Sequence, residues 1–222
     1  MLVQGTTGPV NFGDGVNPPL RQGRQGDVVV SELHGRFYEQ NYRSNVYFTG
    51  GTLTALTANT VTLTATTTPI LGLYNPSSST VNCVVLQAML NCVANNLTSG
   101  AAPGAFVWAV STGNGAVSTG LTPYNAKTLI AAGSQARGFA GSTALTGLTN
   151  NLVVAAGANL PSPSGLTYTT LASTALLPSY TGTENIDGSI IVPPGGVLAL
   201  LNTVSSTVFS AAGRLTWEEV PL

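Results

Sequence analysis

The amino-acid sequence predicts an all-β protein: a jelly-roll-like antiparallel β-sandwich with an extended N-terminal arm. Three observations predict this class. Roughly ten short apolar or alternating segments are separated by Gly, Pro, Asn and Ser turns, as in sandwiches and jelly rolls. The chain has 222 residues, enough for one large all-β domain. The hydrophobic fraction of 43% is the opposite of a disordered composition.

The C-terminal part, residues 188–221, carries the clearest strand pattern. Residues 189–192 and 197–202 are apolar, and Pro-Pro-Gly-Gly between them is a turn sequence. We expect a hairpin here, followed by one or two strands within 207–220 that place Trp217 in the core. The apolar side chains of this stretch exceed what one sheet face needs, so we expect its second face to contact another subunit or a shell.

The N-terminal residues 1–26 are rich in Gly and Pro and show no apolar period. They predict an extended arm that lies across a neighbouring subunit. Residues 27–222 then form a single β-sandwich domain.

The longest predicted strand covers residues 80–94. Strict alternation places Val81, Cys83 and Val85 on one face and Val84, Leu86, Ala88 and Leu90 on the other. Both faces are apolar, so we expect the strand to be buried on both sides. Cys83 and Cys92, nine residues apart, should lie roughly 30 Å from each other and remain free thiols.

The remaining segments are assigned from local composition and alternation. Strands are predicted at residues 27–33, 45–48, 60–66, 69–74, 106–110, 152–156 and 168–175, loops at 75–79 and 178–188, and one or two helical turns at 125–132.

Charge is the unusual quantity in the composition. Charged residues make up 7% of the chain, against about 25% in an ordinary soluble domain. A folded monomer of this mass would expose roughly 600 Å² of surface per charge, which gives little protection against association. We favour a subunit covered by other subunits over a monomer coated in Thr, Ser and Asn. The net charge of −1 gives no case for nucleic-acid binding.

Arg and aromatic residues concentrate near the end of the arm. Because these residue types are enriched in interface hot spots, we predict an interface here. The alternative is a polar strand face with cross-strand pairs among Arg36, Glu39 and Glu32. The candidate interface residues are Arg21, Arg24, Arg36, Tyr38, Tyr42 and Arg43.

Catalytic and metal-binding patterns are sparse. His34 is the sole histidine, no Gly-x-Ser-x-Gly elbow is present, and the two cysteines lack zinc-site spacing. Glu184 and Asp187, with Asn185, could bind calcium weakly, but a solvated loop explains them better. We therefore expect no enzymatic activity and no cofactor. The first residues lack a secretory signal pattern and no apolar run reaches transmembrane length, so we expect a protein made in the cytoplasm without a membrane partner.

Two blocks resemble a known group. Residues 26–40 (GDVVVSELHGRFYEQ) resemble the opening of small structural proteins of tailed bacteriophages, and 192–197 (VPPGGV) through 215–219 (LTWEE) resemble their C-terminal end. The resemblance implies a virion component, namely a head decoration (cement) protein with a jelly-roll core, often trimeric. The implied partners are the major capsid protein and further copies of the chain, and the implied location is the head surface.

The function expected from these observations is non-enzymatic stabilisation of a capsid. The alternative is a tail-tip or fibre module that binds a host glycan or protein through aromatic loops near Trp108, Tyr124 and Tyr180.

Overall fold

The computed structural model describes residues 5–6, 20–21, 36–53, 69–94, 100–101, 104–112, 120–140, 152–160, 167–168 and 179–222. Its elements are β1 (Gly5–Thr6), β2 (Leu20–Arg21), α1 (Tyr38–Tyr42), β3 (Val46–Leu53), β4 (Leu71–Tyr74), β5 (Val81–Ala94), β6 (Gly100–Ala101), β7 (Phe106–Ser111), β8 (Tyr124–Asn125), β9 (Arg137–Phe139), β10 (Val153–Gly157), β11 (Thr167–Tyr168), β12 (Ser179–Asn185), β13 (Ile191–Val192), β14 (Val197–Asn202) and β15 (Phe209–Pro221).

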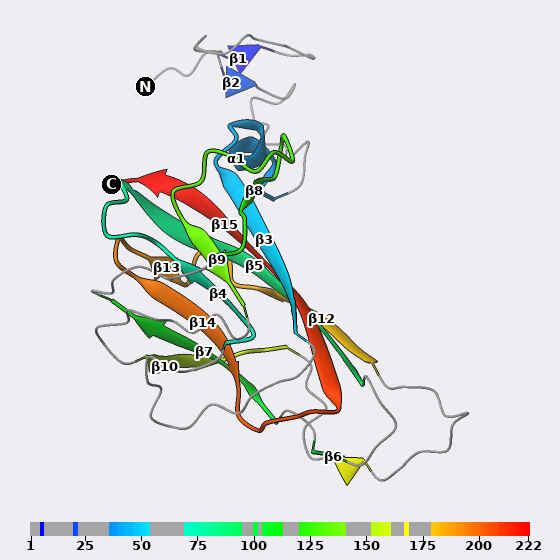
Figure 1. Ribbon diagram of the computed structural model, residues 1–222. Coiled ribbons are helices and arrows are strands. Elements are labelled where there is room, and N and C mark those ends of the chain that lie inside the picture. Colours follow the sequence, from blue (N-terminus) through cyan, green and yellow to red (C-terminus); the bar gives the residue numbers. More distant parts are fainter. Residues whose placement is uncertain are drawn as a thin grey trace. The chain divides into compact units, whose positions relative to one another are not determined.

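Two antiparallel sheets pack face to face (Figure 1). One has the order β12-β5-β15-β3-β8, with β13 also paired to β5, and the other has the order β10-β7-β14-β4-β9. Eight strands form the body of the sandwich, in chain order β3, β4, β5, β7, β10, β12, β14 and β15. One sheet contains the first, eighth, third and sixth of these as neighbours (β3, β15, β5 and β12). The other sheet contains the second, seventh, fourth and fifth (β4, β14, β7 and β10). This interleaving is the jelly-roll arrangement, so the predicted fold class is confirmed.

The chain divides into two units, residues 1–38 and 39–222. The first contains β1 and β2, which pair in parallel, and the second contains the sandwich. The predicted boundary between residues 26 and 27 lies outside the described residues and stays a prediction.

A β-bulge in β5 corrects the expected alternation of that strand. Thr216 of β15 pairs with Gln87 and Trp217 pairs with Val85, so Leu86 is an extra residue. The bulge shifts the phase of the strand. Val81, Cys83 and Val85 before it, and Ala88, Leu90 and Cys92 after it, therefore all reach the same core. The prediction of a strand buried on both faces is wrong, because the other face carries half-buried and exposed residues.

The C-terminal residues do not form the predicted hairpin. β13 pairs with β5 in one sheet, whereas β14 pairs with β4 and β7 in the other. The turn at residues 193–196 is present, but it carries the chain between sheets. The buried Asn75 side chain holds it there, donating from Nδ2 to the carbonyl oxygens of Val81 (2.8 Å) and Val192 (3.0 Å). After β14 the chain forms one long strand, β15, and Trp217 is buried as predicted.

The segment 120–140 closes one edge of the sandwich. It adds β8 beside β3 and β9 beside β4, so it extends both sheets on the same side. The contacts are too close for side chains at two glycines. A Cβ at Gly138 would overlap the buried side chain of Thr49, and one at Gly72 would overlap the ring of Phe139.

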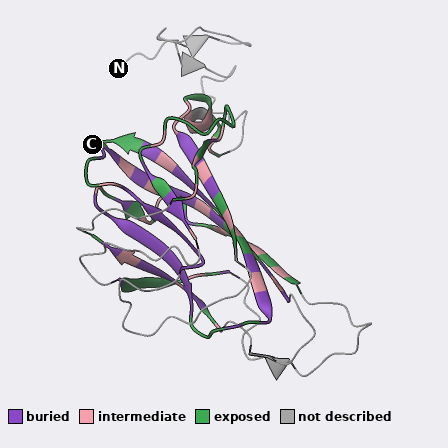
Figure 2. Ribbon diagram, viewed as in Figure 1, coloured by how far each residue is buried: buried purple, intermediate pink, exposed green. Residues whose placement is uncertain are grey.

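The outer face of the five-stranded sheet carries a second apolar cluster. Its buried members include Val197, Ala199 and Leu201 of β14 together with Phe139. β4 and β14 are therefore buried on both faces, as their purple colour in Figure 2 shows. The surplus apolar residues of β14 are covered within the chain, so the expectation that they contact another subunit is wrong.

Three other segments differ from prediction. Residues 38–42 form α1, not the polar strand face considered as the alternative to an interface. The helix ends in a Schellman motif, with Ser44 at φ 64° and the Asn45 N–H bonded to the Gln40 carbonyl oxygen. Residues 126–128 form a turn in place of helical turns. Residues 179–185, predicted as part of a loop, form β12, whose polar side chains suit an edge strand exposed on both faces.

The strands predicted at 45–48, 69–74, 80–94, 106–110, 152–156 and 197–202 are confirmed, as is the turn at 75–79. Those at 27–33 and 60–66, and all but the first residue of 168–175, lie outside the described residues.

Candidate contact surface

The structure describes the backbone of five of the six predicted interface residues. Arg24 lies outside the described residues, and Arg21 belongs to β2. The guanidinium of Arg36 lies 5.7 Å from the centre of the Phe37 ring, and Arg43 is exposed just after α1. Tyr38 and Tyr42 are the first and last residues of α1, 43% and 48% exposed. Residues four apart share one face of a helix, so the two tyrosines lie on the same side of α1.

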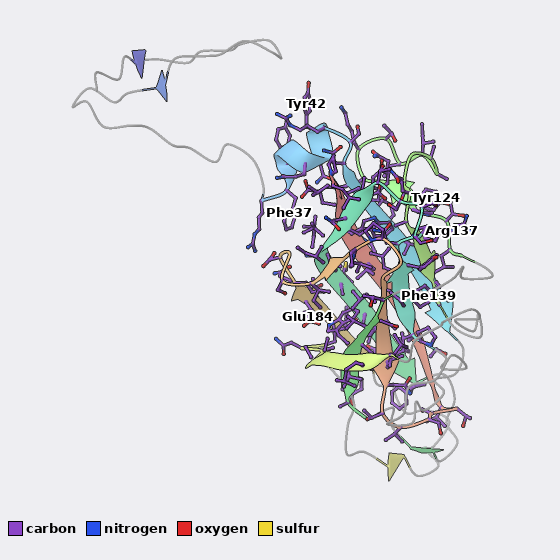
Figure 3. The ribbon with its side chains drawn as sticks, turned by 90° about the vertical axis from the view of Figure 1, so that its left-hand side faces the viewer. Phe37, Tyr42, Tyr124, Arg137, Phe139 and Glu184 are labelled. Atoms are coloured by element: carbon purple, nitrogen blue, oxygen red, sulfur yellow. The ribbon has the colours of Figure 1, made fainter. Side chains whose placement is uncertain are left out.

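Lys127 joins α1 to the turn after β8, a contact that no local sequence pattern predicts. Its Nζ donates a hydrogen bond of 2.6 Å to the carbonyl oxygen of Tyr42 and lies 4.4 Å from the centre of the Tyr42 ring. This is a cation–π geometry. Figure 3 shows Tyr42 and Tyr124, from α1 and β8, toward the same end of the sandwich.

Asn125 organises the turn that follows β8. Its buried side chain accepts hydrogen bonds at Oδ1 from the N–H groups of Lys127 (3.0 Å) and Thr128 (3.2 Å). Its Nδ2 donates to the carbonyl oxygen of Ser44 at 2.8 Å. The Asn125 N–H donates to the Ile130 carbonyl oxygen, which closes the turn. The turn is therefore fixed by hydrogen bonds and tied to the start of β3.

An apolar loop, residues 129–132 (Leu-Ile-Ala-Ala), projects from this fixed turn. Leu129 is 66% exposed and Ile130 is 61% exposed, and the two alanines are exposed as well. Leu129 has φ 58°, in the left-handed region that a branched side chain seldom adopts. The sequence predicts helical turns for this apolar run, so its exposure is a finding of the structure.

The buried Glu219 carboxylate of β15 anchors the part of the segment 120–140 that follows the apolar loop. Its Oε1 accepts hydrogen bonds from the Ser134 hydroxyl (2.6 Å), the N–H of Gln135 (3.1 Å) and the N–H of Ala136 (3.3 Å). The indole N–H of Trp217 donates to the same oxygen at 3.4 Å. Burial, and then the charge of Glu219, raise the pKa of the Tyr47 hydroxyl nearby.

The outer face of the six-stranded sheet carries a shallow hollow of about 290 Å³ over β12, β5 and β15. Its lining is mostly apolar and consists of Met89, Leu90, Asn91, Thr181, Ala212, Gly213 and Arg214. The guanidinium of Arg214 lies 4.9 Å from the centre of the Phe48 ring, and that ring stacks on Tyr124 at 5.9 Å. Arg214 is thus directed along the sheet toward β3.

The predicted calcium candidates do not converge. The Glu184 carboxylate accepts a hydrogen bond of 3.0 Å from the indole N–H of Trp108, which links the two sheets, and Asp187 lies in a turn at φ 52°. Within the described residues no three His, Cys, Asp or Glu side chains are grouped to hold a metal ion. No helix in that part of the chain is long and apolar enough to span a membrane.

The tail-tip alternative needs exposed aromatic loops, but two of its three aromatic residues do not lie in exposed loops. Trp108 is buried in β7, and the half-buried Tyr180 lies on β12 with its ring 6.5 Å from that of Phe209. Tyr124, by contrast, is exposed.

Cys83 and Cys92 are buried and free, as predicted. Burial raises the pKa of both thiols, that of Cys92 to about 12.

No family model, curated protein or solved structure matches this chain.

Proposed function

We propose that this protein is a non-enzymatic structural component of a tailed-phage particle, a decoration protein that binds the outer surface of the head. Its partners are the major capsid protein and further copies of the chain, arranged as a homotrimer. It stabilises the head by covering joints between capsid subunits.

The observation that carries the proposal is a fixed, strained loop that presents Leu129 and Ile130 to solvent on a charge-poor sandwich. Strained backbone persists only where the surrounding structure holds it, and such sites cluster where a protein binds or switches. Exposed apolar side chains held in a rigid loop favour contact with another protein surface.

The charge distribution supports the same class of function. On the outer face of the six-stranded sheet, Arg214 and Glu218 are the charged residues of the described strands, among polar, small and apolar side chains. A sheet face of this kind offers little repulsion to a neighbouring subunit. The jelly roll is a common fold among viral capsid proteins.

The test is the location of the chain in the virus particle. An antibody against the purified protein should label the whole head surface of intact particles in negative-stain microscopy. Particles stripped of the protein should release their DNA at a lower temperature than complete particles, and readdition should restore the original temperature. Labelling confined to the tail would instead support the receptor-binding alternative, and absence of the chain from particles would refute both.

A further inference from the structure

The packing of one chain does not explain why the apolar loop exposes its side chains. Its turn is fixed by Asn125 and Lys127, yet the side chains that it presents, Leu129 and Ile130, remain largely exposed. A polar residue or glycine would suit the left-handed φ of Leu129 better. The combination of a fixed turn, an unfavourable backbone conformation and exposed aliphatic side chains indicates a docking element.

The hollow on the six-stranded sheet is a matching acceptor for aliphatic side chains. It has a volume of about 290 Å³ and is open to solvent along the outer face of the sheet. The side chains of Met89 and Ala212 give it an apolar lining, and Gly213 lets a guest approach the backbone. Because the Arg214 guanidinium lies over Phe48, the charge is directed away toward β3.

The loop of a chain cannot reach the hollow of that same chain. The turn is bound to the start of β3, where the Ala126 N–H donates to the Val46 carbonyl oxygen at 2.8 Å. The hollow lies beside Gly213, which pairs with Gly51 of β3. Five residues of strand separate Val46 from Gly51, about 17 Å. A copy of this loop that fills the hollow therefore belongs to another molecule.

We propose that the apolar loop of one copy docks into the hollow of the next copy, with Ile130 and Leu129 as the inserted side chains. Two different surfaces of the chain then meet, so the contact is heterologous and closes into a ring when the rotation between copies allows it. A ring of three is the simplest assembly consistent with the homotrimer of the proposed function, on which this inference rests for its biological setting.

Cross-linking in trans tests the contact directly on the full-length chain. The variants Ile130→Cys and Thr181→Cys place a thiol in the loop and at the hollow, and the native thiols are buried. With a short bismaleimide, a mixture of the two variants should give cross-linked dimers, and each variant alone should give almost none. A two-fold contact through the loop would instead cross-link Ile130→Cys to itself and would overturn the proposal.

Light scattering after size-exclusion chromatography gives the second readout. The unmodified chain should be oligomeric, and Ile130→Asp and Met89→Lys should each dissociate it while the far-UV β signal stays unchanged. Val153→Asp is the matched control, because Val153 is 65% exposed on β10 of the other sheet and should leave the oligomer intact. An unmodified chain that is monomeric at every concentration, or an Ile130→Asp oligomer equal to the original, would refute the inference.

The outcomes separate this inference from the proposed function. A monomer that binds phage heads, and loses that binding in Ile130→Asp, would assign the loop to the capsid surface and refute docking between copies. A ring that forms as predicted but binds no particle would support the docking and refute the decoration function.

Discussion

Replacing Glu219 with alanine should destabilise the sandwich strongly, because this carboxylate joins β15 to the segment that closes the sandwich edge. Glu219 is 7% exposed and accepts hydrogen bonds from a hydroxyl, two backbone N–H groups and an indole. Alanine would leave all four donors without this acceptor. Water can reach Ser134 and Gln135, which are half-buried and exposed, but Ala136 and Trp217 are buried.

The magnitude follows from those two buried donors. The Ala136 N–H also donates to the Ser134 hydroxyl oxygen at 3.2 Å and keeps that acceptor, so the main loss falls on the Trp217 indole. Leaving a buried donor without a partner costs about 1–3 kcal/mol, so we expect the free energy of unfolding to fall by about 2 kcal/mol. For a chain of this length, the melting temperature should fall by about 4–8 °C. Glu219→Gln keeps one acceptor oxygen and should lose about half as much.

The assay is urea unfolding at neutral pH, followed by the fluorescence of Trp108 and Trp217, which are both buried. The dependence on urea should keep its slope while its midpoint falls. The control is Glu218→Ala, one residue away and pointing to the opposite, half-buried face; its effect should stay within about 0.5 kcal/mol. A loss below about 1 kcal/mol for Glu219→Ala, or equal losses for both variants, would refute the assigned role.

Three further predictions concern packing, thiol chemistry and pH. Gly138→Ala should lower the free energy of unfolding in urea by about 1–3 kcal/mol, because the new Cβ would overlap the buried Thr49 side chain. Gly157→Ala, with open space around it, should leave that free energy unchanged. Equal effects of the two variants would contradict the close packing of β9 on β3. Because burial raises the pKa of both thiols, Cys83 and Cys92 should not react with an aromatic disulfide reagent at pH 8 in the folded protein. Both should react once guanidinium unfolds the chain. Rapid labelling of the folded protein would contradict the burial of the two thiols. Burial raises the pKa of Glu218, so the folded state binds its proton more tightly than the unfolded state does. This contribution to stability is lost as the pH rises through the folded pKa. Glu218→Gln should therefore reduce the decline in stability above about pH 4.5, and an unchanged pH profile would contradict this prediction.

The strand content of the sandwich was predictable because most core strands carry a local signal. Residues 69–74, 106–110 and 197–202 are apolar runs bounded by turn residues, and each forms a strand. The bulge at Leu86 had no such signal, since an inserted residue changes the pairing without changing the composition. Strict alternation therefore assigned half of β5 to the wrong face. β12 was missed because an edge strand needs few apolar residues.

The pairing of the C-terminal strands was not predictable from neighbouring residues. Pro-Pro-Gly-Gly indicates a turn, but the same turn serves a hairpin or a crossing between sheets. Asn75, more than a hundred residues earlier, fixes the crossing through contacts with Val81 and Val192. Such long-range polar contacts leave no mark on the local pattern.

The candidate contact surface was predictable in part. The concentration of Arg and Tyr before residue 44 predicts an interface, and Tyr38 and Tyr42 are exposed in α1, but their role in an interface stays a prediction. Lys127 and the apolar loop were missed for a different reason: their arrangement depends on Asn125 capping a turn, and Leu-Ile-Ala-Ala also suits a buried helix. Exposure of an apolar run becomes visible only once the fold places it.

The most direct test of the decoration function is a cryo-electron microscopy reconstruction of the phage particle that contains this chain. The proposal predicts jelly-roll density on the outer face of the head, in rings of three copies, with the loop of each copy against the β5–β15 hollow of the next. Jelly-roll density found at the tail tip, or a head surface without it, would contradict the proposal.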